Sequence, residues 1–115
     1  MTGTERLRRK LQKVREAVEA GAVRTVQGAA QETAERAKAF VPVDTGTLKG
    51  SIGASGAGLT ATVAAEAEYA AAVELGTASR ESQPFFTPAM QEQRAVIRGK
   101  AAANVREEIT RRCGR

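Results

Sequence analysis

The chain has 115 residues, a length that allows one domain with one modest hydrophobic core. Aromatic residues make up only 3% of it, so the core has to be built largely from alanine and other small side chains, each of which buries little area. There is no His, which removes the usual general acid–base and the commonest metal ligand, and the single Cys113 excludes an intrachain disulfide. We therefore expect no enzyme, no cofactor and no metal, and a thin core that gains from stabilisation by neighbouring subunits.

The net charge of +5 is unevenly distributed. Residues 1–24 carry seven Lys or Arg against three Glu, residues 40–90 carry two basic against five acidic residues, and residues 94–115 carry seven basic against two acidic residues. The basic ends suit nucleic acid or an acidic partner surface, or they form ordinary solvated helix faces. With no signal peptide and no apolar run of membrane-spanning length, we expect no membrane contact.

Apolar residues recur at steps of three or four over residues 4–40, which predicts one long amphipathic helix. Thr4 is the expected N-cap, and Pro42 ends the helix because the residue before a proline avoids helical dihedrals. The near-heptad spacing of the first half permits a coiled-coil-like partner, but we favour packing on the sheet of the same domain. Gly21 and Gly28 weaken the helix or allow another helix to approach closely. The predicted apolar stripe consists of Leu7, Leu11, Val14, Val18, Ala22, Val26 and Ala29.

The middle of the chain is predicted to form a β-hairpin. Asp44-Thr45-Gly46 is typical of a turn, and a short helical turn is expected around residues 47–50. Residues 51–55 and 59–64 have strand character, with Gly56-Ala57-Gly58 as the turn between them.

A short and then a long helix are expected after the hairpin. Residues 69–75 have helical spacing, and Gly76 is their C-terminal stop. Residues 77–83 are polar and predict an exposed loop. Thr87 is the expected N-cap of the last helix, with Pro88 at its first position. Met90, Ile97, Ala101, Val105 and Ile109 form its apolar stripe, Phe85 and Phe86 are its core anchors, and residues 111–115 are expected to fray.

The predicted fold class is therefore α+β: a small antiparallel β-sheet flanked by a long N-terminal helix and a C-terminal helix. All 115 residues form one domain, divided into the first helix (1–40), the sheet with a short helix (41–83), and the last helix with its tail (84–115).

Three short blocks of the sequence together resemble one protein family. They are Val41-Pro42-Val43-Asp44-Thr45-Gly46-Thr47-Leu48-Lys49-Gly50-Ser51-Ile52, then Tyr69-Ala70 with Val73-Glu74-Leu75-Gly76-Thr77, then Gln83-Pro84-Phe85-Phe86-Thr87-Pro88-Ala89. Each block alone is weakly diagnostic, but their order and spacing resemble the small tail-component proteins of long-tailed bacteriophages, which belong to the neck where head and tail meet. The chain departs from that pattern in a short loop between the second and third blocks and in an Ala- and Arg-rich first helix.

The resemblance implies a structural virion protein of a phage or prophage, assembled in the bacterial cytoplasm. It implies a homo-oligomeric, hexameric ring at the head-proximal end of the tail, where tail-completion or neck proteins join tail to head. The implied partners are head-completion or stopper proteins and tail-terminator or tail-tube proteins. Two alternatives remain open, a tail terminator and a basic cytosolic module that binds nucleic acid.

Polar residues of the acidic middle are the predicted contacts to neighbouring subunits or rings, because binding surfaces concentrate on loops and their edges. These are Asp44, Glu66, Glu68, Glu74, Thr77, Arg80 and Glu81. The alternative for the glutamates is a solvated acidic edge. At the C-terminus, Arg111, Arg112 and Arg115 are the predicted lining of a DNA channel, where contact would not depend on base sequence.

Overall fold

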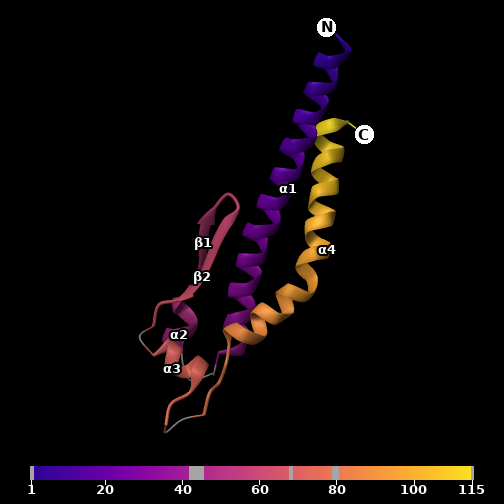
Figure 1. The fold of residues 1–115 in the computed structure, drawn as a ribbon. Coiled ribbons are helices and arrows are strands. Elements are labelled where there is room, and N and C mark those ends of the chain that lie inside the picture. Colours follow the sequence, from indigo (N-terminus) through magenta and orange to yellow (C-terminus); the bar gives the residue numbers. More distant parts are fainter. Residues whose placement is uncertain (1, 42–45, 68, 79–80, 115) are drawn as a thin grey trace.

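The computed structural model describes residues 2–41, 46–67, 69–78 and 81–114. In chain order the elements are α1 (Gly3–Phe40), α2 (Gly46–Ser51), β1 (Ile52–Ala57), β2 (Thr60–Ala65), α3 (Ala70–Leu75) and α4 (Phe86–Cys113). The α+β class is confirmed: a two-stranded antiparallel sheet accompanies a long N-terminal helix and a C-terminal helix. Figure 1 shows α4 running back along α1 in the opposite direction, with the hairpin on another side of α1.

The molecule is a rod. Its principal extents are 72 × 22 × 20 Å and the radius of gyration of its Cα atoms is 19.6 Å, against about 13 Å for a compact domain of this length. The accessible surface is 8067 Å², roughly 2,000 Å² more than a compact monomer of this mass exposes. The fold therefore leaves unusually much surface available for other molecules.

The core lies at one end of this rod. It forms where the C-terminal half of α1 meets α2, the hairpin, α3 and the first turn of α4 (Figure 1). Alanine supplies much of it, as the composition predicts, and Phe85 and Leu48 are its largest fully buried apolar side chains. The buried residues of the core are Ala34, Ala37, Val41, Leu48, Ile52, Val73, Phe85 and Ala89.

The bounds of α1 agree closely with the prediction, but its N-cap does not. Thr2, not Thr4, is the cap: its hydroxyl accepts from the Glu5 backbone N–H at 3.1 Å, and the Glu5 carboxylate accepts from the Thr2 N–H at 3.2 Å. This reciprocal capping box satisfies two amides that would otherwise lack partners. The helix ends at Phe40; Pro42 and most of the predicted turn, Asp44 and Thr45, lie outside the described residues.

The predicted apolar stripe of α1 is not its buried face. Leu7 and Leu11 are 57% and 60% exposed, and Val18 is also exposed. The residues that α1 buries are Ala17, Gly21, Thr25, Ala30, Thr33, Ala34 and Ala37. Small side chains occupy this face because α4 approaches closely, and the hydroxyls of Thr25 and Thr33 are satisfied by bonding back to Gly21 O and Ala29 O.

One of the two α1 glycines has the predicted packing role. A Cβ added at Gly21 would lie 2.6 Å from Val105 Cα and 2.8 Å from its backbone N, so only glycine allows α4 to cross at this distance. At Gly28 an added Cβ would meet nothing within 4 Å. The close-approach prediction is therefore confirmed at Gly21 and wrong at Gly28 within the single chain.

The hairpin is present with its turn shifted. Register pairs Ile52 with Ala65 and Ala57 with Thr60, which leaves Gly58 and Leu59 as a two-residue turn rather than the predicted residues 56–58. Gly58 adopts a φ of +62°, as tight hairpin turns require. The Nε2 of Gln27 donates to Gly58 O at 2.9 Å and to Thr60 O at 3.1 Å, and these bonds tie the turn to α1.

Both later helices are present, with corrections at the ends. Gly76 stops α3 as predicted, with a φ of +79° and its N–H donating to Ala72 O at 2.8 Å. The described part of the following loop is exposed. Helix α4 begins at Phe86 with Phe85 at its N-cap position, so the predicted Thr87 cap is wrong. The predicted fraying is wrong for Arg111–Cys113, which are helical and end at Gly114 in the left-handed conformation.

Candidate interaction surfaces

Glu74 of α3 caps the last helix across a gap in sequence. Its Oε1 accepts from the backbone N–H groups of Phe85 and Phe86, both at 2.9 Å. Its Oε2 accepts from the Thr87 N–H at 3.2 Å and from the Thr87 hydroxyl at 2.7 Å. One carboxylate thus satisfies the amides at the start of α4, where the helix dipole also favours negative charge.

The electrostatics of Glu74 follow from this geometry. Partial burial raises the pKa of Glu74, but the bonds from the amides of Phe86 and Phe85 and from Thr87 outweigh burial and lower the pKa below its ordinary value. All four of these hydrogen bonds are made within the chain. The side chain predicted to contact a neighbour therefore has an internal structural role.

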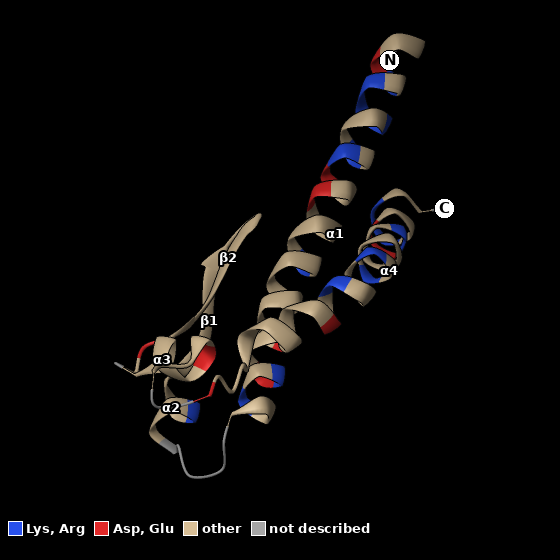
Figure 2. Ribbon diagram, turned by 60° about the horizontal axis from the view of Figure 1, so that its bottom comes forward, with Lys and Arg blue, Asp and Glu red and all other residues tan. Residues whose placement is uncertain are grey.

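The remaining predicted contact residues do not gather into one site. Glu66 and Glu81 are exposed, and the backbone N–H of Glu66 donates to Ser51 O at 3.4 Å. Thr77 is exposed directly after α3. Asp44, Glu68 and Arg80 lie outside the described residues. Figure 2 shows acidic positions around α3, at the end of the rod opposite the free end of α1.

A buried carboxylate, Glu108, links the C-terminal part of α4 to the middle of α1. Glu108 is only 2% exposed; it accepts hydrogen bonds from Arg24 at 2.8 Å and from Arg112 at 3.0 Å, and it forms an ion pair with Arg111 at 3.1 Å. Its hydrogen bonds with Arg112 and then Arg24 lower the pKa of Glu108. Arg24 also donates to Asn104 at 3.2 Å, and Asn104 donates to the Thr25 hydroxyl at 3.0 Å. The sequence analysis missed this cluster. The available signal was that Glu108 lies on the predicted apolar stripe of the last helix, beside Ile109 and three residues after Val105.

This cluster changes the interpretation of the C-terminal arginines. Arg111 and Arg112 were predicted to line a DNA channel; both are exposed, and both are paired with Glu108, while Arg111 also lies 3.4 Å from Glu107. Arg115 lies outside the described residues. Their pairing leaves less uncompensated charge here than the sequence alone indicates.

A second polar pair links the helices nearer the core. Glu32 of α1 accepts from Lys100 at 2.8 Å and from the Nε2 of Gln93 at 3.0 Å. These bonds, Lys100 first, lower the pKa of Glu32. Gln93 is only 6% exposed, and its Oε1 has no hydrogen-bond partner among the described residues. A buried amide oxygen without a donor is uncommon and costs free energy.

An apolar groove lies beside Gln93, between α1, β2 and α4. Its volume is about 610 Å³. Its walls include Val26 and Ala30 of α1, Val63 of β2, and Phe86, Met90 and Ile97 of α4. Met90 was predicted to face the core but is 54% exposed at this groove.

The first four turns of α1 form what we call the N-terminal arm, residues 2–16. Figure 1 shows this segment projecting beyond the end of α4, and none of its residues is buried; Ala17 is the first that is. It carries six Lys or Arg against two Glu, a net charge of +4. Within the described chain none of these six basic side chains forms a salt bridge, and the blue positions along this end of α1 stand out in Figure 2.

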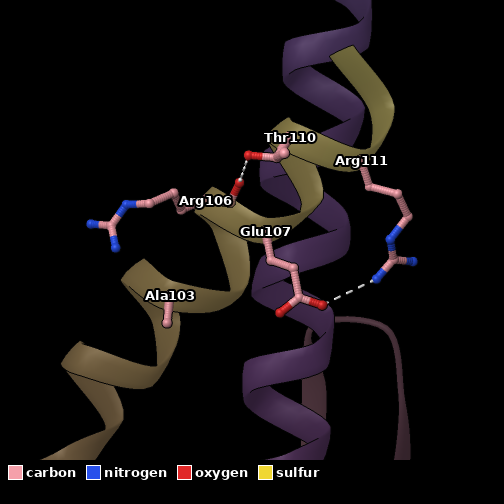
Figure 3. Close-up of a pocket in the computed structure, with 5 residues that line it drawn as sticks. All are labelled: Ala103, Arg106, Glu107, Thr110 and Arg111. Carbon is pink, nitrogen blue, oxygen red and sulfur yellow. Dashed lines mark hydrogen bonds and ion pairs between the residues drawn. The ribbon is translucent and has the colours of Figure 1, made fainter. Parts of the chain in front are cut away.

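A surface hollow near the C-terminus is not a binding cleft. All five of its lining residues come from α4, and Figure 3 shows Glu107 paired with Arg111 and the Thr110 hydroxyl donating to Arg106 O. Because one face of a single helix cannot enclose a ligand, this hollow is not a candidate binding site. Among the described residues there is no cluster of three or more potential metal ligands and no helix with the length and hydropathy of a membrane span.

Comparison with known families gives one match. The model of the family described as "Bacteriophage HK97-gp10, putative tail-component" matches residues 5–76, which is more than half of the chain and includes the first sequence block and the second as far as Gly76. No curated protein and no solved structure matched. The matched region contains α1 from Glu5 onward, the hairpin, and α3 with its capping Glu74. The chain therefore belongs to the HK97-gp10-like family of bacteriophage tail components.

Proposed function

We propose that this tail component forms a ring at the head-proximal end of a long phage tail and joins the tail to the head. The observation that carries the proposal is the rod shape: 72 Å long, with roughly 2,000 Å² of surface beyond that of a compact monomer. Interfaces of permanent assemblies commonly bury about this much or more. A structural protein with a thin core at one end suits a subunit that is completed by its neighbours.

Charge complementarity is the physical mechanism that we propose for assembly. The N-terminal arm carries a net charge of +4, and residues 40–90 carry two basic against five acidic residues. In a ring of identical copies the basic end of one subunit can meet the acidic end of the next. Exposed Glu66, Thr77 and Glu81 belong to that acidic end.

The proposed surroundings follow from the same role. We propose a hexameric ring in the virion neck, in contact with head-completion proteins on one side and tail-terminator or tail-tube proteins on the other, assembled in the host cytoplasm. Non-specific contact with DNA in the channel would then fall to basic side chains that lack an internal partner.

Imaging particles made without this gene tests the proposal. We expect full heads beside detached tails of normal length, because the joint is missing while both parts assemble. Detached tails of irregular and excessive length would indicate a tail terminator instead. Normal, joined particles would contradict both roles.

The unpaired charges of the N-terminal arm favour a second candidate, a basic module that binds nucleic acid. That role predicts salt-sensitive DNA binding by a monomer or dimer, since released counterions drive such binding. Gel filtration with and without duplex DNA at two salt concentrations separates the candidates. The structural role predicts no DNA complex at about 150 mM salt, where exposed charges are well screened.

A further inference from the structure

Two apolar faces have no partner among the described residues, and they lie in different places. One is the stripe of exposed Leu7 and Leu11 with half-buried Val14 on the N-terminal arm, and the other is the apolar groove. Exposed apolar patches of this kind mark interaction sites. We propose that the arm of one copy docks in the apolar groove of the next copy, a contact that deepens the proposed ring and rests on that proposed function.

The dimensions of the two faces match. Leu7, Leu11 and Val14 follow the i, i+4, i+7 pattern of one helix face and span about 10 Å along the axis. The groove is walled by α1 from Val26 to Thr33, about 10 Å of helix, and by α4 from Phe86 to Ile97, about 17 Å of helix. A helix laid in the groove would thus place three apolar side chains along the full length of the α1 wall.

The groove also contains a polar group that lacks a partner. The Oε1 of Gln93 is buried and unsatisfied among the described residues, while the Nε2 is held by Glu32. At 100° per residue, Lys10 and Arg15 of the arm lie at the two edges of the apolar stripe. Neither side chain has a hydrogen-bond acceptor among the described residues, so either one, on a docked arm, could donate to the Oε1 of Gln93.

The occupant that we propose is a second copy, because the arm combines exposed leucines with basic donors that form no salt bridge among the described residues. The one charged side chain that lines the groove is Arg94, so apolar contact and not charge attraction would hold the arm there. The arm cannot reach its own groove. Leu11 precedes the nearest groove residue of α1, Val26, by 15 positions of unbroken helix, or about 22 Å. Docking is therefore intermolecular and head-to-tail, the arrangement that generates rings.

Disulfide mapping tests the contact. On a Cys113→Ser background, one preparation carries Leu11→Cys and another carries Met90→Cys; both residues are more than half exposed, so folding should survive. Mixing them under mild oxidation should give a cross-linked dimer, since Cys pairs bridge only at Cα separations of about 4–7 Å. Gln12→Cys is the matched control: it adjoins Leu11 but points about 130° away from the stripe centre, and it should not cross-link with Met90→Cys.

Self-association gives the second measurement. Leu11→Asp should raise the dissociation constant by at least about tenfold, since a buried leucine is lost from the interface. Gln12→Asp makes the same charge change off the stripe and should leave self-association unchanged. Circular dichroism should show both variants folded.

Failure of this inference is distinguishable from failure of the proposed function. Cross-linking is run on the purified protein and on assembled particles. If particles without the gene have detached tails but no Leu11–Met90 cross-link forms in either setting, the ring role holds and the docking is overturned. If particles are normal without the gene while the cross-link forms, the docking holds and the joining role is wrong.

Discussion

At the scale of single residues, Glu74 has the most consequential placement. A carboxylate on a six-residue helix satisfies three amides and one hydroxyl of a helix that starts 12 positions later. No sequence pattern announces such a cap, because capping patterns are local whereas this contact depends on tertiary structure. The one available signal was negative: residues 83–86 offer no Ser, Thr, Asp or Asn to cap α4.

Glu74→Gln tests the cap. We expect a loss of about 1 kcal/mol in the free energy of unfolding, in the range of other lost N-caps, because the amide presents one acceptor oxygen instead of two. Urea unfolding followed by circular dichroism measures it. Glu81→Gln, an exposed glutamate in the neighbouring loop, is the control and should change stability by less than about 0.5 kcal/mol. Equal effects of the two changes would show that the cap contributes nothing.

Substituting alanine for the two α1 glycines should change the stability of the protein in opposite directions. Gly21→Ala forces a methyl group against the Val105 backbone, and the strain should exceed the gain in helix propensity, with a net loss of up to about 2 kcal/mol. Gly28→Ala meets open space and should stabilise the helix by up to about 1 kcal/mol. Thermal unfolding of both variants decides it. A stabilised Gly21→Ala protein would mean that α4 moves away at no cost.

At the scale of elements, the pairing of α1 with α4 is partly electrostatic. Glu108 and Glu32 both form hydrogen-bonded ion pairs between the helices, and both have a lowered pKa. A group whose pKa is lower in the folded state adds stability above its unfolded value, and that stability is lost as pH falls through the folded value. The helix pair should therefore weaken in acid below the ordinary glutamate pKa of 4.5.

Glu108→Gln should reveal this dependence. The variant should be less stable than the wild type at pH 7, and the difference should narrow as pH falls below about 4.5 and the wild-type carboxylate gains its proton. Urea midpoints at pH 7, 5, 4 and 3 measure the difference. Glu107→Gln is the control, since that side chain is 60% exposed and should matter little at any of these values. If the stability difference between the wild type and Glu108→Gln stayed the same at all four pH values, the ion pairs would not be the source of that difference.

The positions of the helices and strands could largely be predicted from the sequence, but the surfaces against which they pack could not. Pro42, Gly76 and the alternating strand residues mark local boundaries, and those boundaries were found within a few residues. The buried face of α1 was missed because Leu7, Leu11 and Val18 have the same helical spacing whether the face packs inside one chain or between chains. The favoured interpretation, packing on the domain's own sheet, was wrong for the N-terminal arm, which lies beyond both the hairpin and α4.

At the scale of the whole molecule, the rod itself is testable. Small-angle scattering at low concentration should give a radius of gyration near 20 Å, in line with 19.6 Å for the Cα trace, rather than the roughly 13 Å of a compact chain. The Leu11→Asp variant extends the measurement to higher concentration without self-association. A value near 13 Å would mean that the arm folds back on its own chain in solution, which would remove the free surface on which assembly depends.

One geometric consequence follows from the continuity of α1. The arm and the groove wall belong to the same unbroken helix, with their centres about 31 Å apart along its axis. If the arm docks in the groove of the next copy as proposed, the phase of that helix would set how far each copy is rotated from its predecessor, and this rotation would decide after how many copies the ring closes. Inserting one residue between Ala17 and Val26 would swing the arm by about 100° around the axis, so the copy number of the assembly would be encoded in the length of a single helix.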